Sequence, residues 1–182
     1  MLCLSETDRK NILDLARQAV GEAVCRKCPL KQIPKTGLFE SQLGVFVTLH
    51  VAGKLRGCIG VIQAKESLGE SIVHCAIGAA QDDPRFNPLQ PEELWSLAIE
   101  VSLLSPVELI QPEQIEIGKH GLLVEQGFRR GLLLPQVAVE HQLSKEEFLK
   151  ETCRKAGLPQ DAWKTPGTRF YGFTCEIIEE AK

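Results

Sequence analysis

The spacing of apolar residues predicts three long helices in this chain. Residues 5–24 place apolar side chains three, four and seven positions apart, which is the pattern of one buried helix face. Ser5 begins this stretch with Asp8 three residues later, so Ser5 is the expected N-cap. Ser67 and Ser144 each begin the pattern Ser-x-x-Glu ahead of an apolar stripe, which predicts the start of a helix at both positions.

Other segments have the pattern of strands. Residues 44–51 are rich in β-branched and aromatic side chains, and residues 55–63 return after a short turn as the second strand of a hairpin. Residues 96–104 alternate apolar and polar positions, which predicts a half-buried strand. Two short strand-like runs lie within 115–134, and one closing strand is expected over 168–178. Hairpins without regular strand–helix–strand alternation indicate an α+β fold with mainly antiparallel sheets and flanking helices.

Length and charge narrow the possible functions. The 182 residues suffice for one domain or for two small lobes. The net charge is −3 and the basic residues are scattered, so a nucleic-acid binder with a basic stripe is disfavoured. The first ten residues lack the apolar run of a signal peptide, and no stretch approaches the ~18 apolar residues of a membrane span. We therefore expect a cytoplasmic protein with no membrane association.

The seven cysteines are interpreted mainly as small buried residues, because a cytoplasmic chain keeps its thiols reduced. Cys25 and Cys28 form a CxxC pattern, CRKC. A zinc site needs a second pair of ligands at suitable spacing, and none follows. A loop at the end of a helix is the favoured interpretation, and a metal or redox role is the alternative.

The stretch LRGCIG, residues 55–60, combines two glycines, a charge and a thiol within one predicted strand. Strand alternation, with Ile59 and Val61 in the core, assigns the other positions to two faces. The core face holds Leu55 and Gly57, and the open face holds Arg56, Cys58 and Gly60. A guanidinium near a thiol favours the thiolate, and glycines let another backbone or a ligand approach closely. The alternative is a strand bent by glycines that contains an incidental cysteine.

Three further stretches carry candidate chemistry. In DPRF, residues 83–86, Asp83 can accept hydrogen bonds from the turn and Arg85 can contact a carboxylate or a phosphate. His120 lies between glycines in GKHG and can act as a base near neutral pH. Glu100 lies on the polar face of its strand. The structural alternatives are an ordered helix exit for DPRF, a surface turn for His120 and a solvated carboxylate for Glu100.

Common catalytic and cofactor signatures are absent from the sequence. The patterns GxSxG, GxxxxGK[ST], GxGxxG and HExxH do not occur. We therefore expect no nucleotide, flavin or zinc cofactor.

Taken in order, several stretches resemble the AMMECR domain family, whose bacterial and archaeal members are often called AmmeMemoRadiSam system protein A. These are LRGCIG (55–60), DPRF (83–86), EVSLLSP (100–106), GKHGLLV (118–124), GLLLPQVAVE (131–140) and FLKETCRKAGL (148–158). The resemblance covers nearly the whole chain, and LRGCIG followed by LPQVA is highly specific. CRKC is not part of the pattern.

The resemblance implies two lobes with a cleft between them. We expect residues 1–111 and 166–182 to form the large lobe, which carries LRGCIG on the cleft side. Residues 112–165 are expected to form the small lobe, because Pro112 and Pro166 bracket them. Family members occur beside, or fused to, a Memo-like protein related to extradiol dioxygenases and a radical SAM protein, which implies a shared pathway or complex.

Two functional hypotheses follow. The first is a thiol-dependent enzyme acting in the cleft. Its expected catalytic groups are Cys58 as nucleophile, Arg56 as thiolate stabiliser, His120 as base or acid, and Glu100 as an orienting carboxylate. The residues expected to bind substrate are Gly57, Gly60, Asp83, Arg85 and Gln136. The second hypothesis is a non-catalytic module that binds a peptide, a small metabolite, or the Memo-like or radical SAM protein; a nucleic-acid regulator is the least favoured interpretation.

Overall fold

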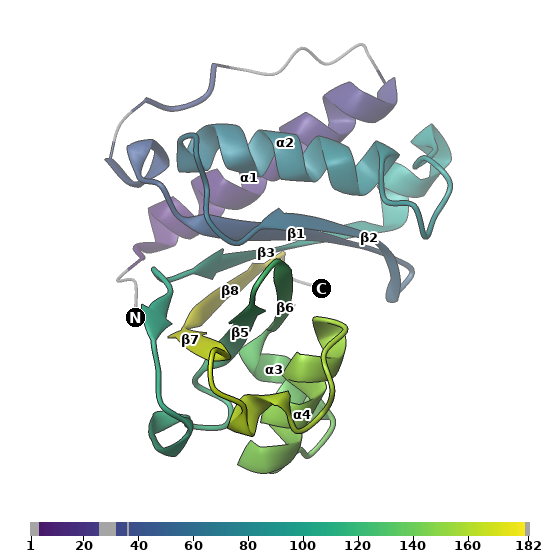
Figure 1. The fold of residues 1–182 in the computed structure, drawn as a ribbon. Helices are drawn as coiled ribbons and strands as arrows, with labels where there is room; N and C mark the ends of the chain where they lie inside the picture. The colour runs from purple at the N-terminus through teal and green to yellow at the C-terminus, as the bar shows by residue number, and fades with distance from the viewer. Residues whose placement is uncertain (1–3, 26–31, 36, 181–182) are drawn as a thin grey trace. The chain divides into compact units, whose positions relative to one another are not determined.

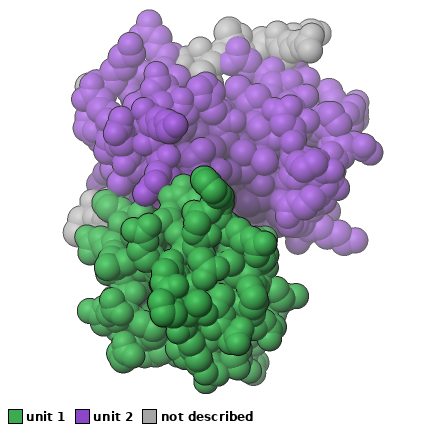
Figure 2. Space-filling model, in the orientation of Figure 1, with its two compact units in different colours: residues 1, 105–175 green, residues 2–104, 176–182 purple. Residues whose placement is uncertain are grey.

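The structure, a computed structural model, describes residues 4–25, 32–35 and 37–180, which divide into two compact units (Figure 2). The larger unit holds the chain up to Leu104 and again from Glu176, and the smaller unit holds Ser105–Cys175. The smaller unit is wider than the expected 112–165, because strands at 108–109 and 169–173 belong to its sheet. The cleft expected between the lobes stays a prediction.

The larger unit is a four-stranded sheet with two helices on one face (Figure 1). The strand order is β2 (Lys54–Val61), β1 (Gly44–Val51), β3 (Leu97–Leu104) and β8 (Cys175–Glu179). Helices α1 (Glu6–Cys25) and α2 (Leu68–Gln81) cover the face that carries the buried side chains of β1 and β3. That face includes Val45, Val47, Leu49, Ile99 and Val101, all at most 1% exposed. The opposite face carries the polar positions.

The helix starts are as expected from the sequence. The backbone N–H of Asp8 donates to the Ser5 hydroxyl at 3.1 Å, and the N–H of Ser5 donates to the Asp8 carboxylate at 3.0 Å. Ser67 and Glu70 form the same reciprocal pair at the start of α2. Each pair satisfies backbone donors that the first helical turn leaves without partners.

The β1–β2 hairpin contains a tight turn and a bulge. Ala52 and Gly53 have φ angles of 48° and 76°, which are the left-handed values of a type I′ turn. The register shifts between Leu49 and His50, so that Leu49 pairs with Gly57 and His50 pairs with Leu55. The bulge interrupts alternation at the beginning of LRGCIG, and Leu55 is 42% exposed instead of lying in the core.

The smaller unit contains a second four-stranded antiparallel sheet (Figure 1). Its order is β4 (Glu108–Leu109), β7 (Arg169–Phe173), β5 (Gly121–Gln126) and β6 (Arg129–Leu133). Helices α3 (Pro135–Glu140) and α4 (Lys145–Lys155) follow, and Phe148 of α4 is fully buried in a cluster with Leu122 and Val124 of β5. The α+β class with mainly antiparallel sheets is confirmed.

The remaining regular elements are short 3₁₀ helices. They are η1 (Gly37–Glu40), η2 (Pro91–Ser96), η3 (Pro112–Gln114) and η4 (Ala162–Lys164). In the described ranges, no helix is both long and apolar enough to cross a bilayer.

The expectation of one closing strand over 168–178 is wrong. Residues 169–173 and 175–179 are separate strands in different sheets, and the break falls at Thr174. The N–H of Thr174 donates to the Ser105 hydroxyl at 2.9 Å, and its carbonyl accepts from the Ser105 N–H at 2.9 Å. At Thr174 these two bonds replace the hydrogen bonds to a neighbouring strand. The chain therefore leaves one sheet and enters the other at this residue, although its sequence alternates throughout.

Candidate functional site

Cys58, Thr48 and Glu100 form one row across three neighbouring strands. Thr48 of β1 pairs with Cys58 of β2 on one side and with Glu100 of β3 on the other. All three are half-buried and lie on the sheet face opposite α1 and α2, because their neighbours along the strands point into the core. The row confirms that Cys58 lies on the open face of LRGCIG.

The Cys58 thiol has a hydrogen-bond donor beside it. The Thr48 hydroxyl donates to Sγ at 3.4 Å. The same face also carries Ser102, whose hydroxyl donates to the Glu100 carboxylate at 3.4 Å. The Thr48 hydroxyl and the Cys58 thiol are therefore in direct contact on this face of the sheet.

The DPRF loop after α2 holds the backbone of Cys58. The Cys58 N–H donates to Oδ2 of Asp83 at 2.8 Å, and its carbonyl accepts from Nη2 of Arg85 at 3.5 Å. Because β2 is at the edge of the sheet, these backbone groups have no neighbouring strand on that side in the described part of the chain. The expected substrate-binding residues Asp83 and Arg85 therefore contact the strand that carries Cys58.

Asp83 and Arg85 form a tight pair. Arg85 donates to Asp83 from its backbone N–H at 3.1 Å, from Nε at 3.0 Å and from Nη2 at 2.7 Å. Asp83 is 4% exposed, and the Arg85 guanidinium holds the pKa of that carboxyl well below its usual range. The pKa of Arg85 is raised, first by Asp83 and to a smaller degree by the Cys58 side chain. Arg85 is thus a cation that interacts with Cys58.

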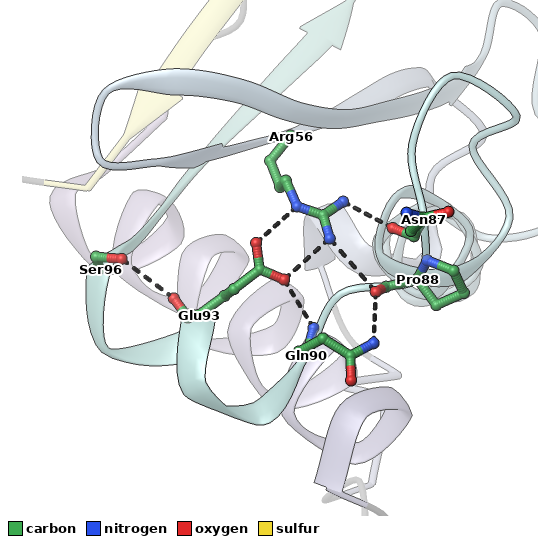
Figure 3. A network of polar contacts seen from close by, with 6 residues as sticks. All are labelled: Arg56, Asn87, Pro88, Gln90, Glu93 and Ser96. Carbon is green, nitrogen blue, oxygen red and sulfur yellow. Dashed lines mark hydrogen bonds and ion pairs between the residues drawn. The ribbon is translucent and has the colours of Figure 1, made fainter.

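Arg56, expected to stabilise the thiolate, has other partners (Figure 3). Its Nε and Nη2 donate to the Glu93 carboxylate at 2.7 and 2.9 Å, and Nη1 and Nη2 donate to the carbonyls of Asn87 and Pro88 at 2.8 and 3.3 Å. Arg56 also lowers the pKa of Glu93. The bulge explains the difference, because Arg56 is the extra residue between paired positions. Arg56 anchors the segment before β3.

The two glycines of LRGCIG have packing roles. A Cβ at Gly57 would lie 2.0 Å from the carbonyl oxygen of Ala79, so the missing side chain lets α2 lie against the sheet. A Cβ at Gly60 would lie 2.2 Å from the ring of Phe46. Gly57 thus allows the close approach of another backbone, which is one of the two uses expected of these glycines. At Gly60 the space that a side chain would take is filled by an aromatic ring.

His120 and Gln136 lie in the smaller unit, whereas Cys58 lies in the larger one. His120 closes a turn over 116–120 in which Gly118 has a φ of 83°. Burial, and then the neighbouring Lys119, lowers the pKa of His120. Gln136 is half-buried in the first turn of α3. The predicted partnership of His120 with Cys58, and substrate binding by Gln136, stay predictions.

The CRKC pattern begins at the C-terminal end of α1. Cys25 is the last helical residue, and Cys28 lies outside the described residues. Among the residues that are described, no group of three or more His, Cys, Asp or Glu side chains is placed to hold a metal ion.

Thr48 and Glu93 are site residues that the sequence analysis missed. The alternation of GVFVTLHV puts the Thr48 hydroxyl on the polar face of its strand, so the sequence was sufficient to predict that face. Its position opposite Cys58 depends on the hairpin register, which the bulge shifts. Nothing local identifies Glu93, which lies 37 residues from Arg56 along the chain.

Comparisons with known proteins show the family of this chain. The AMMECR1 family model matches residues 13–178. The chain belongs to the AMMECR1 family. Protein TK0174 of Thermococcus kodakarensis is 49% identical, with 93% of this chain and 88% of that protein covered. Protein MJ0810 of Methanocaldococcus jannaschii is 43% identical over 86% of this chain and 82% of that protein.

A crystal structure of an AMMECR1-like protein has the same fold. The uncharacterized protein PH0010 of Pyrococcus horikoshii has a TM-score of 0.88 and 42% identity, covering 97% of this chain and 93% of that chain. The names of these AMMECR1 relatives state no activity. The family expected from LRGCIG and LPQVA is confirmed.

Proposed function

We propose that this AMMECR1-family protein is a thiol-dependent enzyme whose reactive group is Cys58. The single observation that carries the proposal is the hydrogen bond from the Thr48 hydroxyl to Sγ of Cys58. A thiolate is the nucleophilic form of cysteine, and a hydroxyl that donates to sulfur stabilises it. The half-buried position leaves Cys58 partly accessible.

The surroundings of Cys58 support the same role. Asp83 and Arg85 fix both backbone groups of the cysteine, which limits the movement of the nucleophile. Arg85 places a positive charge beside the cysteine, with Nη2 at 3.5 Å from the Cys58 carbonyl. Glu100 lies on the same face of the sheet two strands away, with Thr48 between them.

The proposed setting is a pathway shared with a Memo-like protein and a radical SAM protein. The support for this setting is the resemblance of the chain to proteins encoded beside them. A reactive free thiol also suits the reducing cytoplasm expected from the sequence. Cys58 is a free cysteine in the described part of the chain.

The test of the proposal compares Thr48→Val with Thr48→Ser. Val has the shape of Thr without the hydroxyl, whereas Ser keeps the hydroxyl. We expect alkylation of Cys58 by iodoacetamide, followed by mass spectrometry of the Cys58 peptide, to slow about fivefold or more in Thr48→Val and to stay near wild type in Thr48→Ser. Equal rates in all three proteins would contradict the proposal.

A cellular measurement tests catalysis directly. We expect a Cys58→Ala strain to accumulate at least one metabolite that the wild-type strain does not, in untargeted profiling. A Cys175→Ala strain is the matched control, since Cys175 is also half-buried. Identical profiles for Cys58→Ala and wild type would count against an enzyme.

The second candidate function is a non-catalytic binding module for the Memo-like or radical SAM protein. The observation that favours it is Trp95, which is 95% exposed in η2. The carbonyl of the next residue, Ser96, accepts from the N–H of Ala52 at 3.3 Å, so η2 ends beside the hairpin turn. Exposed tryptophans are frequent anchors of protein interfaces. Co-purification of a partner that survives Cys58→Ala but is lost in Trp95→Ala would favour this function.

A further inference from the structure

A pocket of about 510 Å³ lies within the smaller unit, beside His120. Its volume is in the range of small-molecule sites. The polar residues that line it include Ser105, Glu108, Gln114 and His120. They come from the segment before β4, from β4, from η3 and from the turn that precedes β5. The pocket therefore brings together polar side chains from four consecutive parts of the chain.

The tautomer of His120 is fixed by a backbone donor. The N–H of Glu116 donates to Nδ1 of His120 at 3.1 Å, and the N–H of His120 donates to the carbonyl of Glu116 at 3.0 Å. A backbone N–H can only donate, so Nδ1 is the acceptor and the neutral ring carries its proton on Nε2. Protonation of Nδ1 would break this bond. His120 therefore offers a neutral N–H donor to the pocket.

The charge that lines the pocket is negative. Glu108 and Glu116 are both lining residues, and the lining contains no lysine or arginine. Lys119 pairs with Glu116 at 2.7 Å. Glu108 is exposed and has no ion-pair partner among the described residues. One carboxylate of the pocket is thus available to a cationic ligand.

The pocket also has an apolar side. Leu109 is 61% exposed and Phe173 is buried, and both line the pocket. The ring of Phe173 lies over Gly121, where a Cβ would be 2.3 Å from it. Apolar side chains beside a free carboxylate suit an organic cation better than an inorganic one, because the charged part and the apolar part of the ligand both gain contacts.

We propose that this pocket binds a small molecule that joins an ammonium group to a compact apolar body. Glu108 accepts the ammonium, the exposed side chains of Pro106 and Leu109 contact the apolar body, and the Nε2–H of His120 donates to an oxygen or π-face of the ligand. The site uses no residue of the larger unit. It is independent of the thiol chemistry proposed for Cys58.

The experiment uses three probes of the same shape on the full chain. Benzylamine is the cationic probe, benzyl alcohol the neutral one and benzoate the anionic one, each titrated with observation of backbone amide and His120 ring NMR signals. We expect saturable shifts at His120 and Thr174 with benzylamine at millimolar concentrations, and at least about tenfold weaker binding of the other two probes.

Two glutamine variants test whether Glu108 is the carboxylate that binds the ammonium group. We expect Glu108→Gln to weaken benzylamine binding about tenfold. Glu113→Gln should leave it unchanged, because Glu113 is an exposed carboxylate of η3 that does not line the pocket. Both variants change exposed side chains, so unchanged amide spectra elsewhere verify the fold. Equal binding of the three probes, equal effects of the two variants, or no saturation by about 10 mM benzylamine would overturn the proposal.

Discussion

The Asp83 carboxylate accepts a hydrogen bond from the backbone N–H of Cys58 at 2.8 Å. Asp83 is 4% exposed and its second partner is Arg85, so one buried side chain joins the DPRF loop to LRGCIG. The two motifs lie 25 residues apart in the chain and form one structural unit. Predictions about stability and about the thiol follow from this contact.

Replacing Asp83 should destabilise the larger unit. Asp83→Ala leaves the Cys58 N–H without its partner, and we expect a loss of about 1–3 kcal/mol in the free energy of unfolding. Asp82→Ala is the matched control, since Asp82 is an exposed carboxylate at the neighbouring position. Urea unfolding of both variants provides the measurement, and similar losses would contradict the assignment.

Asp83 also predicts an acid sensitivity. Its pKa is lower in the folded chain than in the unfolded chain, so its contribution is complete above the unfolded pKa near 3.9. Stability is lost as the pH falls from there toward the folded pKa. We expect the stability difference between wild type and Asp83→Asn to shrink between about pH 4 and pH 2 in urea unfolding. A constant difference would contradict it.

Two glycine-to-alanine changes should have opposite signs. Gly57→Ala places a Cβ 2.0 Å from the Ala79 carbonyl, which forces the strand and α2 apart, and we expect a loss of about 1–3 kcal/mol. Gly21→Ala, in the interior of α1 with nothing within 4 Å of the new Cβ, should gain about 0.5–1 kcal/mol because alanine favours the helix. Thermal and urea unfolding measure both, and a neutral Gly57→Ala would show that α2 can move away.

Arg56 should matter for stability and not for the thiol. Arg56→Lys cannot reproduce the two-point contact with Glu93 or the bonds to both carbonyls, and we expect a loss of about 1–2 kcal/mol in urea unfolding. The alkylation rate of Cys58 should stay near wild type in Arg56→Lys and fall in Arg85→Gln. The reverse order would restore Arg56 as the cation that acts on Cys58.

His120 should titrate below the ordinary histidine value of about 6.5. Because folding favours its neutral form, stability decreases as the pH falls from about 6.5 to the folded pKa, and is constant below it. Lys119→Gln removes a neighbouring positive charge and should raise the pKa of His120. NMR titration of the His120 ring measures both values. An ordinary pKa in the wild type would contradict the burial of the ring.

Local patterns predicted the elements, and long-range contacts decided the site. The capping pairs at Ser5 and Ser67 could be recognised because both partners lie within one helical turn. The partners of the Arg56 side chain could not be predicted, because they depend on a bulge, and a bulge depends on the pairing of two strands. Alternation across 168–178 likewise hides the change of sheet at Thr174, which is set by its bonds to Ser105.

The contacts of Cys58 with the DPRF loop limit how another molecule can reach it. An edge strand ordinarily offers free N–H and C=O groups on which a further strand can be added, whether from a peptide or from a second copy of the chain. At Cys58 the carboxylate of Asp83 and the guanidinium of Arg85 already occupy those groups. LRGCIG is thus protected against strand addition at its cysteine, and a ligand of the thiol must approach from the face of the sheet.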